Sequence, residues 1–184
     1  MRKYVYLMTR NQGKILAANS SFSKYDIEVR SLDFEIPEIQ ADTSIEIAKY
    51  AVERAWEKFH EPVIREDHSF FIDELGMPGP YMAYIERQID LDHLIKILKT
   101  LDKRTGHWSI GTAFMDKDGR VHEFTFDVPI VFELEPRGEE INSWIRLVRF
   151  ANEARVLTEY PEEERLHVWN VNYEKIAKLI AEQE

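Results

Sequence analysis

The spacing of apolar residues along the chain predicts alternating strands and helices. Residues 4–8 form an apolar run with strand character, and residues 45–59 place apolar side chains at helical spacing, as do residues 91–101. An apolar run at 108–115, an Asp-Gly turn and an alternating run at 124–132 predict a β-hairpin. This order of elements indicates an α/β fold.

The end of the chain and its length complete the layout. Apolar spacing in residues 173–180 predicts a final helix. Pro129, inside the alternating run, indicates an edge strand or a bulge, because proline has no N–H to donate to a ladder. The chain has 184 residues and shows neither an internal repeat nor a linker. We therefore expect a single domain spanning residues 1–184.

Composition and charge narrow the functional classes. Hydrophobic residues make up 44% of the chain and charged residues 32%, which is an ordinary globular balance. No apolar stretch approaches the roughly 20 residues of a membrane helix. Cysteine is absent, and the net charge of −10 comes without a basic stripe. We expect a cytoplasmic protein that binds neither membranes nor nucleic acid.

Two adjacent carboxylates give the first chemical signal. Glu66 and Asp67 follow a short apolar run, residues 62–64, that has the character of a buried strand ending at the acids. Carboxylate oxygens are the ligands that Mg²⁺ prefers in proteins. An isolated Glu-Asp pair is more often a solvated acidic loop, so the pair needs support from other segments.

The polar segment after the first predicted strand offers such support. A strand, a small polar turn and a helix N-terminus can bind a phosphate, because backbone N–H groups and the helix dipole favour an anion. Lys14 adds a full positive charge. The segment lacks the glycine spacing of a Walker P-loop, and a plain strand-to-helix connection is the alternative. Its residues are Thr9, Arg10, Asn11, Gln12, Gly13 and Lys14.

Taken in order, these and further motifs resemble the inosine triphosphate pyrophosphatase (Ham1-like) family. The motifs are Thr-x-Asn-x-x-Lys at 9–14, Ile-Pro-Glu-Ile-Gln at 36–40, Lys49 in a helix, Glu66-Asp67, and Leu-Gly-Met-Pro-Gly-Pro-Tyr at 75–81. They cover about the first half of the chain. Members of this family hydrolyse non-canonical purine nucleotides such as ITP, XTP and dITP. The resemblance implies two lobes around an elongated mixed β-sheet with flanking helices and a cleft between the lobes.

The resemblance also implies a role for each matching residue. Asp67 would be the general base for water attack on the α-phosphorus, giving a monophosphate and pyrophosphate, and Glu66 would assist it. Mg²⁺ would be held by Glu38, Glu66 and Asp67. The expected substrate-binding residues are Thr9, Arg10, Asn11, Gln12, Gly13, Lys14, Lys49, Trp144 and Arg165.

The second half of the chain diverges from the family pattern. The family reads the base with Phe-Gly-Trp/Tyr-Asp, Glu-Lys-Asn and Ser-His-Arg motifs. The matching places hold Asn-Ser-Trp-Ile at 142–145, Glu-Glu-Arg-Leu at 163–166 and Trp-Asn-Val at 169–171. Only Trp144 and Arg165 keep the chemical character of the motif.

Three functional hypotheses follow. The first is a Mg²⁺-dependent nucleoside triphosphate pyrophosphatase. The second is a divergent, catalytically weak paralogue that binds a nucleotide or a metal and serves a regulatory role, and the third is a structural subunit with a vestigial cleft. Because members of the family are commonly homodimers, we expect a homodimer with a nucleoside triphosphate as its small-molecule partner.

Overall fold

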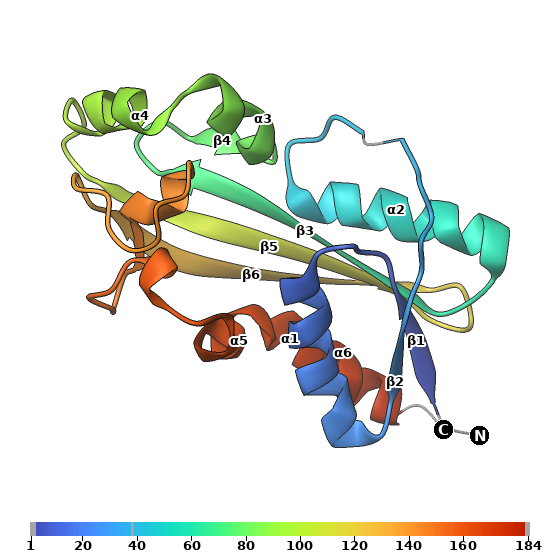
Figure 1. Cartoon of the computed structure of the whole chain (residues 1–184). Coiled ribbons are helices and arrows are strands. Elements are labelled where there is room, and N and C mark those ends of the chain that lie inside the picture. Colours follow the sequence, from blue (N-terminus) through green and yellow to red (C-terminus); the bar gives the residue numbers. More distant parts are fainter. Residues whose placement is uncertain (1–2, 38, 183–184) are drawn as a thin grey trace. The chain divides into compact units, whose positions relative to one another are not determined.

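The computed structural model describes residues 3–37 and 39–182 (Figure 1). Glu38, one of the predicted metal ligands, therefore lies outside the described residues. The strands are β1 (Tyr4–Leu7), β2 (Glu28–Ser31), β3 (Val63–Ile72), β4 (Met77–Gly79), β5 (Thr105–Met115), β6 (Val121–Phe132) and β7 (Val148–Phe150). The α-helices are α1 (Gln12–Phe22), α2 (Ser44–Phe59), α3 (Met82–Gln88), α4 (Leu91–Leu98), α5 (Leu166–Trp169) and α6 (Val171–Glu182).

The strands pair in the order β2-β1-β3-β5-β6-β7, and β4 pairs with β3. Strand β1 is parallel to both β2 and β3, whereas β4 is antiparallel to β3 and β7 is antiparallel to β6. The predicted α/β fold with a mixed sheet and flanking helices is therefore confirmed. None of the helices described is long and apolar enough to cross a membrane.

The chain forms two compact units, and the three long strands contribute residues to both. The first unit comprises residues 1–67, 110–126 and 162–184, and the second comprises residues 68–109 and 127–161. Each unit has its own core.

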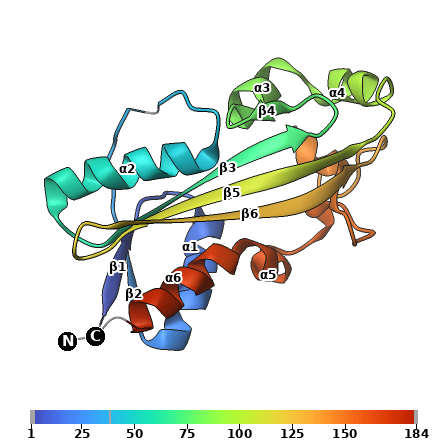
Figure 2. The same cartoon turned by 180° about the vertical axis from the view of Figure 1, so that it is seen from behind.

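In the first unit, helices cover both faces of the sheet (Figures 1 and 2). Helices α1 and α6 pack against one face, where Leu7, Ile64 and Phe114 form the core with Phe22 and Tyr173. On the other face, α2 packs against an apolar cluster that includes Met8, Val63, Ala113 and Met115. Neighbouring residues of a strand thus contribute to opposite cores, as the two-residue period of a strand requires.

Helix α2, predicted from its apolar spacing, is fixed at its N-terminal end by a cap and by close contact with the sheet. Thr43 caps its N-terminus by accepting from the N–H of Glu46, whose carboxylate accepts in return from the N–H of Thr43. The first turn lies directly on Gly111 of β5, where an added Cβ would come within 2.3 Å of the backbone nitrogen of Ile45. Only a glycine allows the helix to approach the sheet this closely.

The second unit has an aromatic core. The ring of Phe70 lies 4.8 Å from Trp108 and 5.7 Å from Phe132, measured between centroids, and 6.4 Å from Trp144. Leu94 and Leu98 of α4 are fully buried. Apolar contact of this kind stabilises the unit.

One prediction about strands was wrong, and of the two alternatives predicted from Pro129, an edge strand or a bulge, the structure excludes the edge strand. The strand predicted at 62–64 continues to Ile72, so Glu66 and Asp67 lie inside β3 and not at its end. Strand β6, which contains Pro129, is not an edge strand, because it has β5 on one side and β7 on the other. The pairing of β6 with β7 begins at Ile130, one residue after the proline. The missing N–H therefore falls outside that ladder.

Candidate active site

The loop between β1 and α1 is shaped by its own polar side chains. The side-chain oxygen of Asn11 accepts from the N–H of Lys14 at 3.2 Å and so caps α1. The N–H of Asn11 donates to the hydroxyl of Thr9 at 3.1 Å. These two bonds fix the entry of the helix, and the N-terminus of α1 presents its positive dipole end there.

Lys14 reaches from this loop to β3. Its ammonium donates to the backbone carbonyl of Glu66 at 2.9 Å and lies 3.8 Å from a carboxylate oxygen of the same residue. The Lys14 side chain is only 18% exposed. Burial lowers the pKa of Lys14, and the carboxylates of Glu66 and Asp67 oppose that shift. The structure therefore brings Lys14 and Glu66, two of the residues singled out from the sequence, into contact in the first unit, and the charge of Asp67 also acts on Lys14.

Glu66 is a buried carboxylate with several polar neighbours. The hydroxyl of Thr112 on β5 donates to it at 3.4 Å. The Tyr173 phenol lies close enough that, after burial, the negative charge of Glu66 is the next cause that raises the pKa of Tyr173 well above its ordinary value. A carboxylate without such partners would be costly in this core.

The strand geometry separates the two adjacent acids. Successive side chains of a strand point to opposite faces, so the pleat of β3 directs Asp67 away from the face occupied by Glu66. Arg65 shares the Asp67 face and donates to the carbonyl of Met8 at 3.0 Å. Within residues 3–37 and 39–182, no group of three or more His, Cys, Asp or Glu side chains is placed to hold a metal ion.

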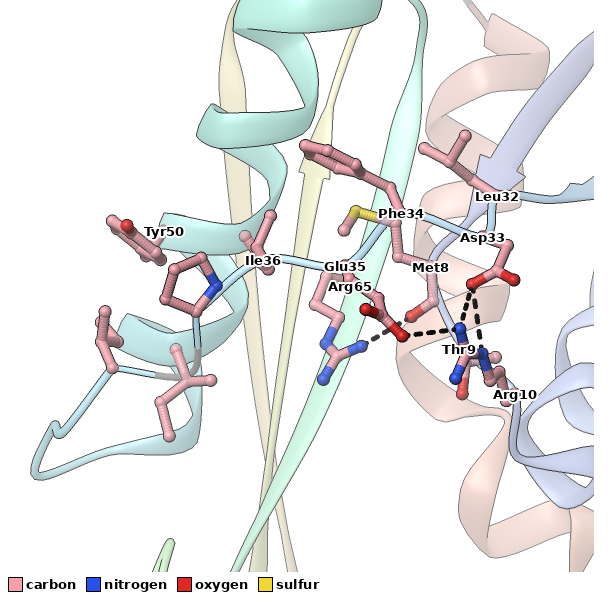
Figure 3. A pocket seen from close by; sticks show the side chains of 14 residues that line it. Met8, Thr9, Arg10, Leu32, Asp33, Phe34, Glu35, Ile36, Tyr50 and Arg65 are labelled. Atoms are coloured by element: carbon pink, nitrogen blue, oxygen red, sulfur yellow. Dashed lines mark hydrogen bonds and ion pairs between the residues drawn. The ribbon is translucent and has the colours of Figure 1, made fainter.

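A pocket of 480 Å³ borders the same loop, on the α2 side of the first unit (Figure 3). Thr9 and Arg10 line one side of it, and Phe34, Ile36 and Tyr50 give it apolar walls. Figure 3 shows the exposed guanidinium of Arg10 bound to Asp33 at 2.6 Å and to Glu35 at 3.1 Å. Arg10 is therefore neutralised by two acids as the structure stands.

Lys49, the other lysine predicted to reach substrate, points to a different partner. It lies on α2, and its ammonium contacts a carboxylate oxygen of Glu123 on β6 at 2.7 Å. Both side chains are partly exposed, which is typical of a surface ion pair of small net stability. A phosphate would have to compete with Glu123 for this lysine.

The two residues predicted to contact the base lie in different units. Trp144 belongs to the second unit and is 2% exposed. Its indole N–H donates to the carbonyl of Ile89 at 2.8 Å, so the ring serves the aromatic core. Arg165 belongs to the first unit and is half-buried; among the residues that the structure describes, its Nε has no hydrogen-bond partner. Neither role is tested by these contacts.

Sequence reasoning missed two polar residues beside Glu66. Thr112 is buried in β5, and Asn172 is buried in α6. Thr112 sits within an apolar strand, and the helical spacing draws attention to Tyr173 and not to its neighbour. The available signal was a single amide on the buried side of an otherwise apolar helix, where a polar group must find a partner.

Comparisons with known proteins give a consistent result. The Ham1 family matches residues 5–168. The dITP/XTP pyrophosphatase of Methanopyrus kandleri is 36% identical over 137 residues, which cover 74% of this chain and 73% of the relative. The dITP/XTP pyrophosphatase of Ignicoccus hospitalis is 34% identical over 140 residues, covering 75% and 74%.

Solved structures agree on the fold. The Ham1 protein of Staphylococcus aureus superposes with a TM-score of 0.80 at 20% identity, covering 99% of this chain and 100% of the other. The HAM1 protein of Coxiella burnetii gives a TM-score of 0.78 at 16% identity, covering 98% and 99%. The match to the family extends well beyond the motifs of the first half, and the chain belongs to the Ham1 family.

Proposed function

We propose that this protein is a nucleoside triphosphate pyrophosphatase that hydrolyses dITP, XTP and ITP to the monophosphate and pyrophosphate. The observation that carries the proposal is the contact of Lys14 with Glu66 beside the capped N-terminus of α1. Two relatives more than 30% identical to this chain carry the name dITP/XTP pyrophosphatase. The residue types and the relatives thus support the same reaction.

The first unit supplies a cationic site for the triphosphate. Lys14 contributes charge, and the N–H groups at the start of α1 contribute a dipole directed at an anion. Thr9 and Asn11 hold the loop in shape, and Lys49 is available from α2 once it leaves Glu123. The whole chain carries a net charge of −10, so a local positive site is needed to accept a highly charged nucleotide.

The chemical step is in-line attack of water on the α-phosphorus. Asp67 takes a proton from the water as its oxygen bonds to phosphorus, and the bond from that phosphorus to the bridging oxygen breaks. The leaving pyrophosphate departs with this oxygen, and Lys14 stabilises the charge that develops on it. Glu66 holds Lys14 through its carbonyl and its nearby carboxylate.

Mg²⁺ is the metal that this site would take. Glu66 and Asp67 leave β3 on opposite faces, and the described residues hold no cluster of three acids, so one of these carboxylates would hold the ion together with substrate phosphates, an arrangement that Mg²⁺ commonly adopts. Glu38, outside the described residues, would be a further ligand. When bound, the metal neutralises phosphate charge and lowers the pKa of a coordinated water.

Base selection is the part of the proposal that differs most from the sequence motifs. Trp144 has almost no exposed ring surface for stacking, whereas Arg165 has an unpartnered Nε among the described residues. We keep Arg165 as the proposed base contact, since a guanidinium donates to the oxygen at position 6 of hypoxanthine or xanthine. A cytoplasmic homodimer remains our expectation from the family resemblance.

The divergent binding paralogue is the second candidate, and the altered segment at 142–145 favours it. Pyrophosphate release from ITP, XTP, dITP, GTP, ATP, UTP and CTP, measured with Mg²⁺ and with EDTA, separates the two. The proposed function predicts metal-dependent release that is fastest with ITP, XTP and dITP. Binding of these nucleotides without release from any of the seven would favour the paralogue.

A further inference from the structure

Three polar side chains form a continuous chain in the core of the first unit. Asn172 of α6 is 2% exposed, Thr112 of β5 is 0% exposed and Glu66 of β3 is 3% exposed. The Asn172 side-chain nitrogen lies 3.1 Å from the Thr112 hydroxyl, and that hydroxyl lies 3.4 Å from a carboxylate oxygen of Glu66. Residues far apart in sequence thus meet in a region otherwise filled by apolar groups.

The direction of each hydrogen bond in this chain follows from chemistry. The Asn172 side-chain nitrogen also lies 3.2 Å from the carbonyl of Ile110 and 3.4 Å from the carbonyl of Phe124. Both are acceptors, so the NH₂ end of the amide must face them; the reverse orientation would place three oxygens together. An NH₂ group only donates, so the Thr112 hydroxyl, which lies at the shortest of the three distances, is an acceptor; the two hydrogens serve three acceptors, and the longest contact, to Phe124, is the weakest.

A hydroxyl that accepts in this way has its single hydrogen left to donate. The Thr112 oxygen accepts from Asn172 on one lone pair, and its hydrogen is directed to Glu66. The backbone carbonyls of Ile110 and Phe124 anchor the amide. The relay thus fixes the Oε2 atom of the Glu66 carboxylate, whereas the Lys14 ammonium lies near Oε1.

We propose that Asn172 and Thr112 are positioning residues, which hold the Glu66 carboxylate, and through it Lys14, in place for the triphosphate. This inference rests on the proposed function for its catalytic consequence. Its structural part, the hold on Glu66, stands on the hydrogen bonds alone.

A purely structural role explains this chain less well. Buried polar groups contribute little net stability compared with apolar groups of the same shape, and valine matches the shape of threonine. Thr112 is flanked on its own face of β5 by Phe114, which belongs to the apolar core. The chain of three buried polar groups ends on Glu66, which holds Lys14. A positioning role requires such support from neighbouring hydrogen bonds.

The test compares Thr112→Val with Thr112→Ser, because the first keeps the shape and the second keeps the donor. We expect Thr112→Val to lower kcat for dITP by about ten- to a hundredfold, since a displaced catalytic group has this order of effect. KM should change much less, and Thr112→Ser should retain most of the wild-type kcat. Thr125→Val, an exposed change on β6, is the matched control and should behave as wild type.

A double-mutant cycle separates the relay from general damage to the core. If Asn172 acts through Thr112, then Asn172→Ala lowers kcat on its own but costs little more in the Thr112→Val background. Fully additive losses would overturn the relay, and so would a Thr112→Ser protein as impaired as Thr112→Val. Should Thr112→Val fail to fold, Asn172→Ala alone provides the test, because it removes the hydrogen bond to the Thr112 hydroxyl and keeps the hydroxyl itself.

Crystal structures of the same variants distinguish failure of this inference from failure of the proposed function. The Glu66 carboxylate should leave its wild-type position in Thr112→Val and in Asn172→Ala, and keep it in Thr112→Ser. If the wild-type protein releases no pyrophosphate, the proposed function fails, yet the position of Glu66 still decides whether the relay holds it. An unmoved Glu66 in both Thr112→Val and Asn172→Ala would overturn the inference.

Discussion

The two units of the chain bury different kinds of side chain. The first unit encloses the Lys14–Glu66 contact and the polar chain through Thr112 and Asn172. The second unit encloses aromatic rings, Trp144 among them, with its indole N–H bound to a backbone carbonyl. Buried charge is costly and buried aromatic surface is favourable. The cost in the first unit indicates function, whereas the core of the second unit is explained by stability alone.

This contrast parallels part of the sequence. The family motifs at 9–14 and 66–67 lie in the first unit, where the structure brings Lys14 and Glu66 into contact. The altered segment at 142–145 belongs to the second unit, where Trp144 is part of the core, whereas the altered segments at 163–166 and 169–171 belong to the first. Substitutions at the site in the first unit should therefore lower catalytic activity, whereas substitutions in the core of the second unit should lower the free energy of unfolding.

The largest effect is expected from Asp67→Asn in the first unit. Removing the general base should lower kcat for dITP by about 10³-fold, within the range known for general base catalysis, without changing the side-chain volume. Pyrophosphate release and thermal unfolding measured on the same preparation provide the check. Near-normal turnover in a folded variant would remove Asp67 from the mechanism.

Lys14→Met should have the next largest effect. It removes the cation of the phosphate loop and leaves Glu66 without its charged neighbour, so kcat/KM should fall by about 10²-fold, the order seen when one charge-stabilising group is lost. Lys24→Met is the matched control, because Lys24 pairs with Glu174 at the exposed surface of the same unit. Equal losses of kcat/KM in both variants would show that the activity depends on the number of positive charges and not on the position of Lys14 in the loop.

Between the lowered pKa of Lys14 and 10.5, the pH dependence of activity and that of stability should have opposite signs. Burial lowers the pKa of Lys14 from its ordinary value of 10.5, so the unfolded chain holds this proton more tightly than the folded one. As pH rises through the lowered pKa towards 10.5, this group's contribution to the free energy of unfolding increases. Over the same interval, kcat/KM should decline because the cation is lost.

Denaturant unfolding and steady-state kinetics across this range provide the measurement. The Lys14→Met protein should lack the alkaline increase in stability that the wild-type protein shows. If wild type and variant have the same pH profile of stability, Lys14 is not the group responsible.

The smallest effect on activity is expected from Trp144→Phe in the second unit. The change leaves the carbonyl of Ile89 without its donor and opens a small gap, at a cost of about 1–3 kcal/mol in the free energy of unfolding. We expect kcat/KM for dITP and its ratio to that for ATP to stay unchanged. A shift in that ratio would show that Trp144 contacts the base, and the second unit would then also contribute to function.

Much of the first unit could be predicted from apolar spacing and motifs. The helix predicted at 45–59 is α2, and the motif Thr-x-Asn-x-x-Lys lies at the start of α1. The length of β3 could not be predicted, because residues 65–68 are polar and resemble a loop. They remain in the strand because Glu66 finds partners in Lys14 and Thr112, which sequence spacing does not reveal.

The same limit applies to the site. The buried positions of Thr112 and Asn172 depend on strands and helices distant in sequence, so a lone polar residue on an apolar face indicates that it needs a partner but not which residue the partner is. Trp144 shows the converse case. The residue type suggested that the indole ring of Trp144 stacks on a base, but tertiary packing near Phe70 decides how much of this ring is exposed.

Hydrolysis of dITP in H₂¹⁸O with Mg²⁺ tests the central claim most directly, because it reports which phosphorus the water attacks. Water attack on the α-phosphorus predicts one ¹⁸O atom in dIMP and none in the pyrophosphate. Label in pyrophosphate, release of inorganic phosphate as the first product, or no turnover by the wild-type protein would contradict water attack on the α-phosphorus at the site in the first unit.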